Sequence, residues 1–154
     1  MWTAWLRGID DLVELAGPVG EEHLARAEAQ LGHPLPAELR SLLAETDGLV
    51  DASGGEPVWP LERIVAENAD PGGGAPPPAE GGAGLFFFGD AGGEDLFAYR
   101  AHGAARPEGL ATDVLATDVL IWEHEQGAAR WAAPDLQALL DEWLSRDPSD
   151  SSVE

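Results

Sequence analysis

The spacing of apolar residues changes partway along this chain, and the change limits the possible folds more than any other feature of the sequence. Up to residue 68, apolar side chains recur at intervals of three and four, which is the spacing of amphipathic helices. From residue 85 onward, short apolar runs between glycine-rich or polar turns are typical of β-strands. Helices that come first and strands that cluster later predict the α+β class, not alternating βαβ units.

The first predicted helix extends to Gly17 and Pro18, which stop it. Its apolar face comprises Trp2, Trp5, Leu6, Ile9, Leu12 and Val13. The other predicted helices cover residues 21–31, 36–47, the second half of 57–68, and 136–144. Gly48 is expected to end the third helix.

Strands are predicted over residues 85–89 and 95–100, and again over 119–122 with a partner strand around Trp131. The segment between the first two strands reads GDAGGED, and its glycines permit a tight turn. We expect the first two strands to pair antiparallel, and the turn from Gly89 to Asp95 to be exposed and free of ligand.

The chain is predicted to form one domain. Glycine, proline and alanine dominate residues 69–84, so this stretch is expected to be a flexible loop within the domain. Because loop length enters closure entropy only logarithmically, deleting residues 71–82 should change stability little.

The sequence LATDV occurs at 110–114 and again at 115–119. A shift of five residues along a strand turns every side chain to the opposite face, so only the second copy is expected in the core. The predicted domain covers residues 1–146, and a disordered polar tail covers 147–154.

The charge balance restricts the possible partners. Eight lysines and arginines against 29 aspartates and glutamates give a net charge of −21. Such a surface repels nucleic acid and anionic lipid, so neither is expected as a direct partner, whereas a basic protein would be attracted. An acidic proteome in the source cell would explain the charge equally well. The chain has no cysteine, no signal-peptide pattern and no long apolar run, so a cytoplasmic protein is expected.

No motif in the sequence predicts an enzyme, and we expect no catalytic residue, cofactor or metal. The GDAGGED turn lacks the lysine and hydroxyl of a phosphate-binding loop, and its acids do not have calcium-loop spacing. In WEHEQG, Glu123 and Glu125 would lie on one face of a strand and His124 on the other, which disfavours a metal site. A metal-dependent hydrolase that uses scattered carboxylates and His124 is kept as a third hypothesis.

Acidic residues on rigid turns are the best candidates for binding a partner, because they lose less entropy on binding than residues on flexible segments. The candidate residues are Asp47, Asp51, Glu56, Trp59, Asp90, Glu94, Asp95, Glu123 and Glu125. Trp59 is included as the tryptophan whose burial is least expected. Charge reversal at Asp51, Glu94 and Glu125 is expected to slow association with a partner without unfolding the domain.

Three segments together resemble the SUKH superfamily, the Smi/Knr-like group. The first is a helix pair of the form E-x-x-LG-x-x-LP-x-x-L-x-x-LL-x-x-x-x-G. The second is an FG-x-x-GG-x-x-x-F-A turn, and the third is a W-x-H-E hairpin. In the helix pair the matching residues are Glu28, Leu31, Gly32, Leu35, Pro36, Leu39, Leu42, Leu43 and Gly48. The likeness extends in family order from Ile9 to Leu144.

The resemblance implies helices packed around a curved, largely antiparallel (mixed) sheet and a role without catalysis. Many bacterial members look like immunity proteins that bind and neutralise a toxin domain, often a nuclease. The fungal relatives suggest an alternative, an intracellular scaffold or regulatory interaction module of the cell-wall-regulator type.

Overall fold

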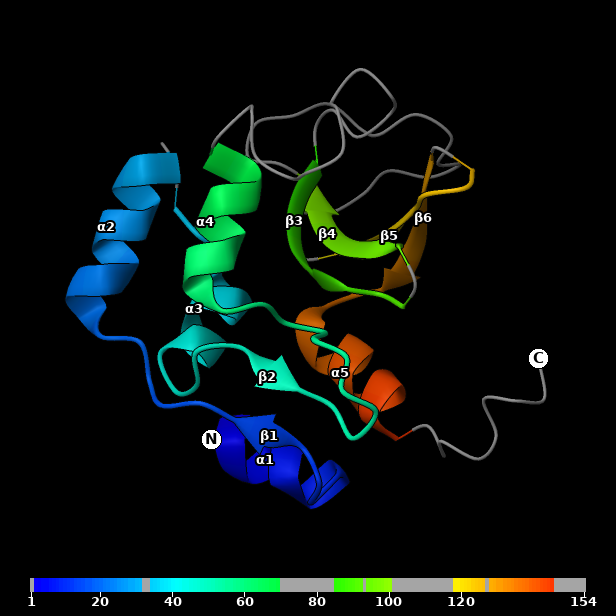
Figure 1. Ribbon diagram of the computed structural model, residues 1–154, viewed down its shortest axis with the longest axis horizontal. Coiled ribbons are helices and arrows are strands. Elements are labelled where there is room, and N and C mark those ends of the chain that lie inside the picture. Colours follow the sequence, from blue (N-terminus) through cyan, green and yellow to red (C-terminus); the bar gives the residue numbers. More distant parts are fainter. Residues whose placement is uncertain are drawn as a thin grey trace.

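The computed structural model describes residues 2–31, 34–69, 85–92, 94–100, 118–126 and 128–145 (Figure 1). These residues form a single α+β domain, as predicted. Its elements are α1 (Trp2–Ile9), β1 (Glu14–Leu15), α2 (Glu21–Leu31), α3 (Ala37–Leu43), β2 (Leu49–Val50), α4 (Leu61–Ala69), β3 (Leu85–Asp90), β4 (Leu96–Arg100), β5 (Val119–Glu123), β6 (Ala128–Ala133) and α5 (Leu136–Leu144). Within the described ranges, none of the helices has the length and apolar character needed to cross a membrane.

The main sheet has four strands in the order β3-β4-β5-β6, and every neighbouring pair is antiparallel. This arrangement confirms the predicted pairing of the two strands beside GDAGGED and the predicted hairpin around Trp131. Strands β3, β4 and β5 are mostly buried because their side chains are apolar on both faces, as in the run Leu85, Phe86, Phe87 and Phe88. Figure 1 shows the curvature of the sheet.

The prediction that Gly89 lies in an exposed turn is wrong. Strand β3 continues to Asp90, and Gly89 is buried opposite Phe97. A Cβ atom at Gly89 would overlap the carbonyl of Pro57, so only glycine allows the chain at Pro57 to lie against the strand. The exposed part of the turn begins after Asp90.

The free side of β3 is closed by two other segments. Trp59 N donates to Phe88 O at 2.8 Å, and Asp90 N donates to Glu56 O at 2.8 Å. From α4, the Asn68 side chain bonds the backbone of Phe87 in both directions, at 2.9 Å and 2.7 Å. Helix α4 is thereby held beside β3, with α2 packed along its other side (Figure 1).

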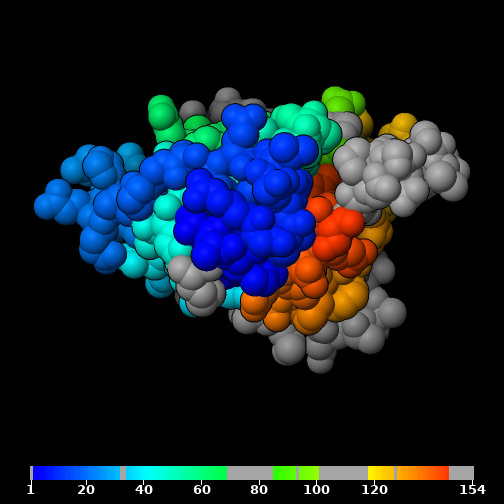
Figure 2. Space-filling view, turned by 90° about the horizontal axis from the view of Figure 1, so that it is seen from below, coloured from blue at the N-terminus to red at the C-terminus, as the bar shows by residue number. Residues whose placement is uncertain are grey.

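The N-cap of helix α5 is Asp135, whose side chain accepts a hydrogen bond from Ala138 N at 2.7 Å. It packs against β6 and α3, and Leu136 N donates to Glu38 Oε1 at 3.0 Å across the α3 contact. Figure 2 shows α1 lying against α5 on the underside of the molecule. The largest fully buried side chains are Trp59, Tyr99, Phe88, Phe97, Leu6, Leu24, Leu39, Leu42, Leu43, Ile64, Leu120 and Leu136.

The first helix is shorter than predicted. It ends at Ile9, after which Asp10 Oδ1 accepts a hydrogen bond from Leu12 N at 2.9 Å and turns the chain. Leu12 is exposed, and Glu14–Leu15 leaves the helical path to pair with Leu49–Val50. The apolar residues that the sequence assigned to one helical face are therefore divided between α1 and the turn that follows it.

The third helix also ends early, at Leu43 and not just before Gly48. Its N-cap is Pro36, in agreement with the predicted start. Thr46 is buried after the helix, where its hydroxyl donates to Gly48 O at 2.7 Å and accepts from Ala16 N at 2.8 Å. Gly48 itself has a φ of 83°, so it serves the turn that follows the helix.

Some predictions concern residues outside the described ranges. They include most of the 69–84 segment and the proposed deletion of 71–82, the first LATDV copy at 110–114, and the tail at 147–154. Ala69 itself is the last residue of α4. From the second LATDV copy, Asp118 and Val119 are described and buried, and Val119 begins β5.

Candidate interaction surface

The β3–β4 turn and the β5–β6 turn meet at one end of the sheet. Asp95 Oδ1 accepts a hydrogen bond from His124 N at 2.9 Å, and His124 Nε2 lies 3.5 Å from Glu94 Oε2. The two turns enclose a hollow of about 360 Å³ whose walls carry the carboxylates of Glu94, Asp95, Glu123 and Glu125. Two turns that are distant in the sequence thus present their carboxylates side by side.

A third acidic segment joins this end of the sheet through Glu56. Its carbonyl accepts the hydrogen bond from Asp90 N, and its carboxylate lies 3.0 Å from Arg63 Nη1. The same guanidinium nitrogen lies 3.5 Å from Asp90 Oδ2. Arg63 therefore bridges two carboxylates that would otherwise repel each other.

We call the set Glu56, Asp90, Glu94, Asp95, Glu123 and Glu125 the acidic edge. Among the described residues, the arginines that pair with it are Arg63 and Arg130, the latter through Glu123 at 3.0 Å. Half of the set, Glu94, Asp95 and Glu125, therefore has no arginine partner among the described residues. Glu94 is well exposed, with 78% of its side chain accessible to solvent.

Asp51 supports the acidic edge from beneath and is not part of its surface. Its carboxylate accepts hydrogen bonds from Ser53 N, Ser53 Oγ, Gly55 N and Trp143 Nε1, at 2.7–3.0 Å. Burial by itself would raise the pKa of Asp51, but the bonds from Ser53 and Trp143 and the backbone bonds outweigh it and lower the pKa. The expectation that Asp51 is an exposed charge is therefore wrong, and a lysine there would face several donors in a buried position.

Trp143 of α5 contacts two of the three acidic segments. Besides its bond to Asp51, its ring packs edge-on against Phe97 at 5.2 Å and lies beside Gly92. One tryptophan from the last helix thus orders the 51–56 segment and the β3–β4 turn together.

Two predicted binding residues lie elsewhere. Trp59 is fully buried, with Arg63 stacked 4.3 Å from its ring centre, so it cannot contact a partner directly. Asp47 is half-buried at the start of α4, where its Oδ1 accepts a hydrogen bond from Leu61 N at 2.8 Å. It satisfies the first turn of that helix and lies at a separate groove.

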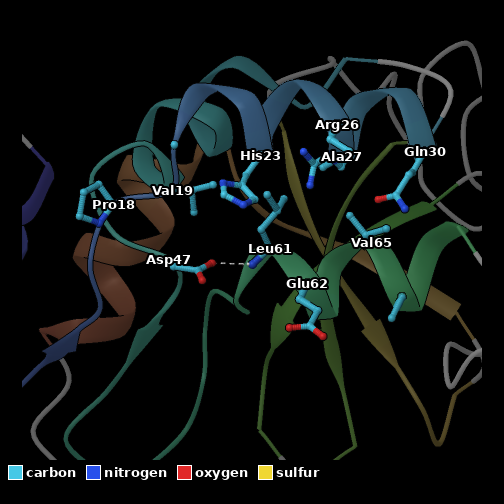
Figure 3. Close-up of a pocket in the computed structure, with 12 residues that line it drawn as sticks. Pro18, Val19, His23, Arg26, Ala27, Gln30, Asp47, Leu61, Glu62 and Val65 are labelled. Atoms are coloured by element: carbon cyan, nitrogen blue, oxygen red, sulfur yellow. Dashed lines mark hydrogen bonds between the residues drawn. The ribbon is translucent and has the colours of Figure 1, made fainter.

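That groove runs between α2 and α4 and has a volume of about 690 Å³ (Figure 3). Its apolar lining includes Val19, Ala27, Leu61, Val65 and Ala66. His23, Arg26 and Gln30 line it from α2, and Asp47 and Glu62 line the opposite side. The apolar spacing of the sequence did not predict this groove. The available signal was alanine at positions 27 and 66, because small side chains leave space between packed helices.

Within the described ranges, no group of three or more histidines, aspartates and glutamates has a geometry that could hold a metal ion. At the acidic edge, the His124 ring lies beside the Glu94 carboxylate, and the His124 backbone N–H donates to the Asp95 carboxylate. The arrangement is suited to binding a positively charged surface.

The comparison with protein families agrees with this architecture. The model described as SMI1 / KNR4 family (SUKH-1) matches residues 18–142. The matched segment includes the acidic edge and the α2–α4 groove, and it leaves out α1 and β1. Among curated proteins, none matches the chain.

Proposed function

Since this chain belongs to the SMI1/KNR4 family (SUKH-1), we propose that it is a non-enzymatic immunity protein that neutralises a toxin by direct binding. The toxin domain is a nuclease, and the acidic edge covers its basic, nucleic-acid-binding surface. The protein acts in the cytoplasm of a bacterium, where such a nuclease would meet its substrate.

The observation that carries this proposal is the convergence of carboxylates from three turns on one end of the sheet. A nuclease must present lysine and arginine side chains to hold phosphates. A surface that displays several carboxylates competes with nucleic acid for those lysine and arginine side chains. The net charge of −21 also attracts the basic toxin domain before the two surfaces touch.

The rigidity of the acidic edge favours tight binding. Its turns are held by backbone hydrogen bonds such as Ala91 N to Asp95 O at 2.9 Å and Asp95 N to Gly92 O at 3.0 Å. Side chains presented by an ordered backbone lose less conformational entropy when a partner binds. Charge complementarity then contributes mainly to the association rate and to specificity.

If a nuclease toxin domain is encoded beside this chain's gene, the test measures the rate at which that domain associates with the chain, by stopped-flow fluorescence over a range of salt concentrations. The double variant Glu94→Lys/Glu125→Lys should associate at least about tenfold more slowly at low salt, with a flatter salt dependence. Both side chains are exposed, so the fold should be unchanged.

A matched control is Asp11→Lys/Glu22→Lys, which changes the net charge equally at exposed positions away from the acidic edge. This control should associate nearly as fast as the wild type. Equal slowing by both double variants would mean that only overall charge matters, and the acidic edge would not be the binding surface.

The second candidate function is the scaffold or regulatory module, which the α2–α4 groove favours. An apolar helical segment of a non-toxic protein would dock there on Val19, Leu61 and Val65. Ala66→Arg, which places a long side chain in the groove, would then abolish the interaction, whereas Glu94→Lys/Glu125→Lys would leave it intact. Under the immunity function, Glu94→Lys/Glu125→Lys would weaken the interaction with the partner, whereas Ala66→Arg would leave it intact.

A further inference from the structure

The two edges of the four-stranded sheet differ in whether their backbone groups are satisfied. On the β3 side, the chain at residues 56–59 and the Asn68 side chain bond the strand, as described above. On the other side, β6 is the last of the described strands in the sheet order. Within the described ranges, the hydrogen bonds of the β6 backbone are those of its ladder with β5. Strand β6 is therefore an edge with outward N–H and C=O groups open to a partner.

The side chains of β6 do little to prevent another strand from pairing there. Four of its six residues are alanines, and the other two are Arg130 and Trp131. Arg130 is neutralised by Glu123 at 3.0 Å, so the edge carries no uncompensated charge of its own. Natural proteins usually protect such edges with free charges or proline, and both are missing from this strand.

Trp131 marks this edge as a contact surface. It is 49% exposed, and the described residues contain only one other large exposed apolar side chain, Leu12. Trp131 lies opposite Leu120 and Arg130 opposite Ile121, so these neighbours point to opposite faces of the sheet. A strand added beside β6 would therefore meet tryptophan on one face and Arg130, Ala132 and Glu142 on the other, around a hollow of about 240 Å³.

Charge decides between the possible occupants of the edge. Pairing of β6 with β6 of a second copy would bring together two chains that each carry −21, which repel. A basic strand is attracted by the same field and reaches β6 next to Glu123 and Glu125, at the start of the hairpin. Its basic side chains would lie near Glu142 and the acidic edge, and its apolar side chains would cover Trp131.

We propose that β6 accepts a short extended strand of the basic partner, in which basic and apolar residues alternate, as a fifth strand of the sheet. This inference rests on the proposed function and names the backbone contact through which the partner is held. The register shift of the β5–β6 ladder beside Leu120 limits the regular edge to residues 128–131, so the added strand is short. Main-chain hydrogen bonds supply the alignment, and the alternating side chains supply the specificity.

The test uses a synthetic eight-residue peptide in which lysine alternates with valine and tyrosine, with both ends blocked. Its control is the same peptide with every second backbone nitrogen methylated. Methylation keeps each charge and side chain but removes the N–H donors along one edge of the peptide strand, the edge that would pair with β6. Binding is measured by isothermal titration calorimetry, and nuclear magnetic resonance follows amide exchange in residues 128–133. We expect the parent peptide to bind at least about tenfold more tightly than the methylated one and to slow exchange at alternate β6 amides.

Trp131→Ala should weaken binding of the parent peptide about fivefold or more, whereas Leu12→Ala, at the other exposed apolar residue, should not. Equal binding of the two peptides, perturbation confined to residues 94–95 and 123–125, or no binding at all would each overturn the edge proposal. Protection of β6 without peptide, together with a dimer in analytical ultracentrifugation, would assign the edge to a second copy and overturn it as well.

The two proposals fail in different ways. If the peptide protects β6 but no nuclease domain associates with the chain, the immunity function fails while the edge site stands. If a nuclease domain associates through the acidic edge and the peptide leaves β6 unchanged, the edge site fails alone.

Discussion

At the scale of single residues, Asp51 shows how a carboxylate in a very acidic protein can be structural. It lies in a loop between β2 and α4, yet it accepts four hydrogen bonds and joins that loop to Trp143 of α5. Those donors are arranged for an ionised oxygen pair, which explains the lowered pKa in spite of burial. The acidic edge depends on this residue for its shape and not for its charge.

Asp51→Ala should reduce the free energy of unfolding by about 2–3 kcal/mol at pH 7, because buried donors lose a charged acceptor. The pKa of Asp51 is lower in the folded state, so its stabilisation is complete above the unfolded-state value near 4 and is lost as pH falls through the folded-state value. The difference between wild type and variant, measured by urea unfolding, should therefore shrink below about pH 4.

Glu94→Ala is the matched control for this experiment, since Glu94 is exposed and should change the unfolding free energy by less than about 0.5 kcal/mol. A difference for Asp51→Ala that stays constant or grows between pH 7 and pH 3 would contradict the structural role of the ionised form.

At the scale of elements, the N-terminal segment divides its apolar residues between two structures. Leu6 is fully buried on α1, which is anchored by Trp2 Nε1 to Ser41 Oγ at 3.0 Å and by Thr3 N to Glu45 Oε1 at 3.1 Å. Leu12 follows the turn at Asp10 and is 67% exposed. One continuous helix would have placed both leucines on the same buried face.

A pair of alanine substitutions distinguishes an α1 that ends at Ile9 from a helix that continues past it. Leu6→Ala should reduce the free energy of unfolding by about 2–5 kcal/mol, because it leaves a cavity in the core. Leu12→Ala should change it by less than about 0.5 kcal/mol. Similar large losses in both variants, measured by guanidinium unfolding, would show that the helix continues past Ile9.

At the scale of the whole molecule, the scarce cations are placed where they hold segments together. Arg40 joins Glu21 and Glu28 of α2 to α3, and Arg63 joins Glu56 to Asp90. Each of these two arginines is shared by two carboxylates, and the chain as a whole has 29 acidic residues against eight basic ones, so negative charge is in excess. The fold therefore carries self-repulsion that is relieved when salt screens it or when a basic partner binds.

Raising the concentration of sodium chloride from about 0.01 M to about 1 M shortens the screening length from about 30 Å to about 3 Å. The melting temperature should rise by a few degrees over this range, as differential scanning calorimetry would measure. Glu94→Lys/Glu125→Lys should show a smaller rise, since each reversal removes a negative charge and adds a positive one. A melting temperature that falls with salt would mean that the arginine ion pairs outweigh the repulsion.

Local patterns were sufficient to predict the class of the fold and most of its elements. The helices at 21–31 and 136–144 and all four strands of the main sheet follow from apolar spacing, which is a property of neighbouring residues. The β3–β4 pairing was also predictable, because a short glycine-rich turn brings its two strands together. The acidic residues of the turns could also be identified from the sequence, because they stand beside turn-forming residues.

Contacts between distant residues decided what local patterns could not. Helix α1 ends early because Glu14 pairs with Val50, and Asp51 is buried because Trp143, 92 residues away, donates to it. Trp59 is buried and Gly89 cannot carry a side chain because residues 57–59 lie against β3. The convergence of the acidic turns and the open edge at β6 depend on the order of strands in the sheet. A spacing pattern records which residues are apolar, but burial and proximity are set by which elements the whole chain brings together.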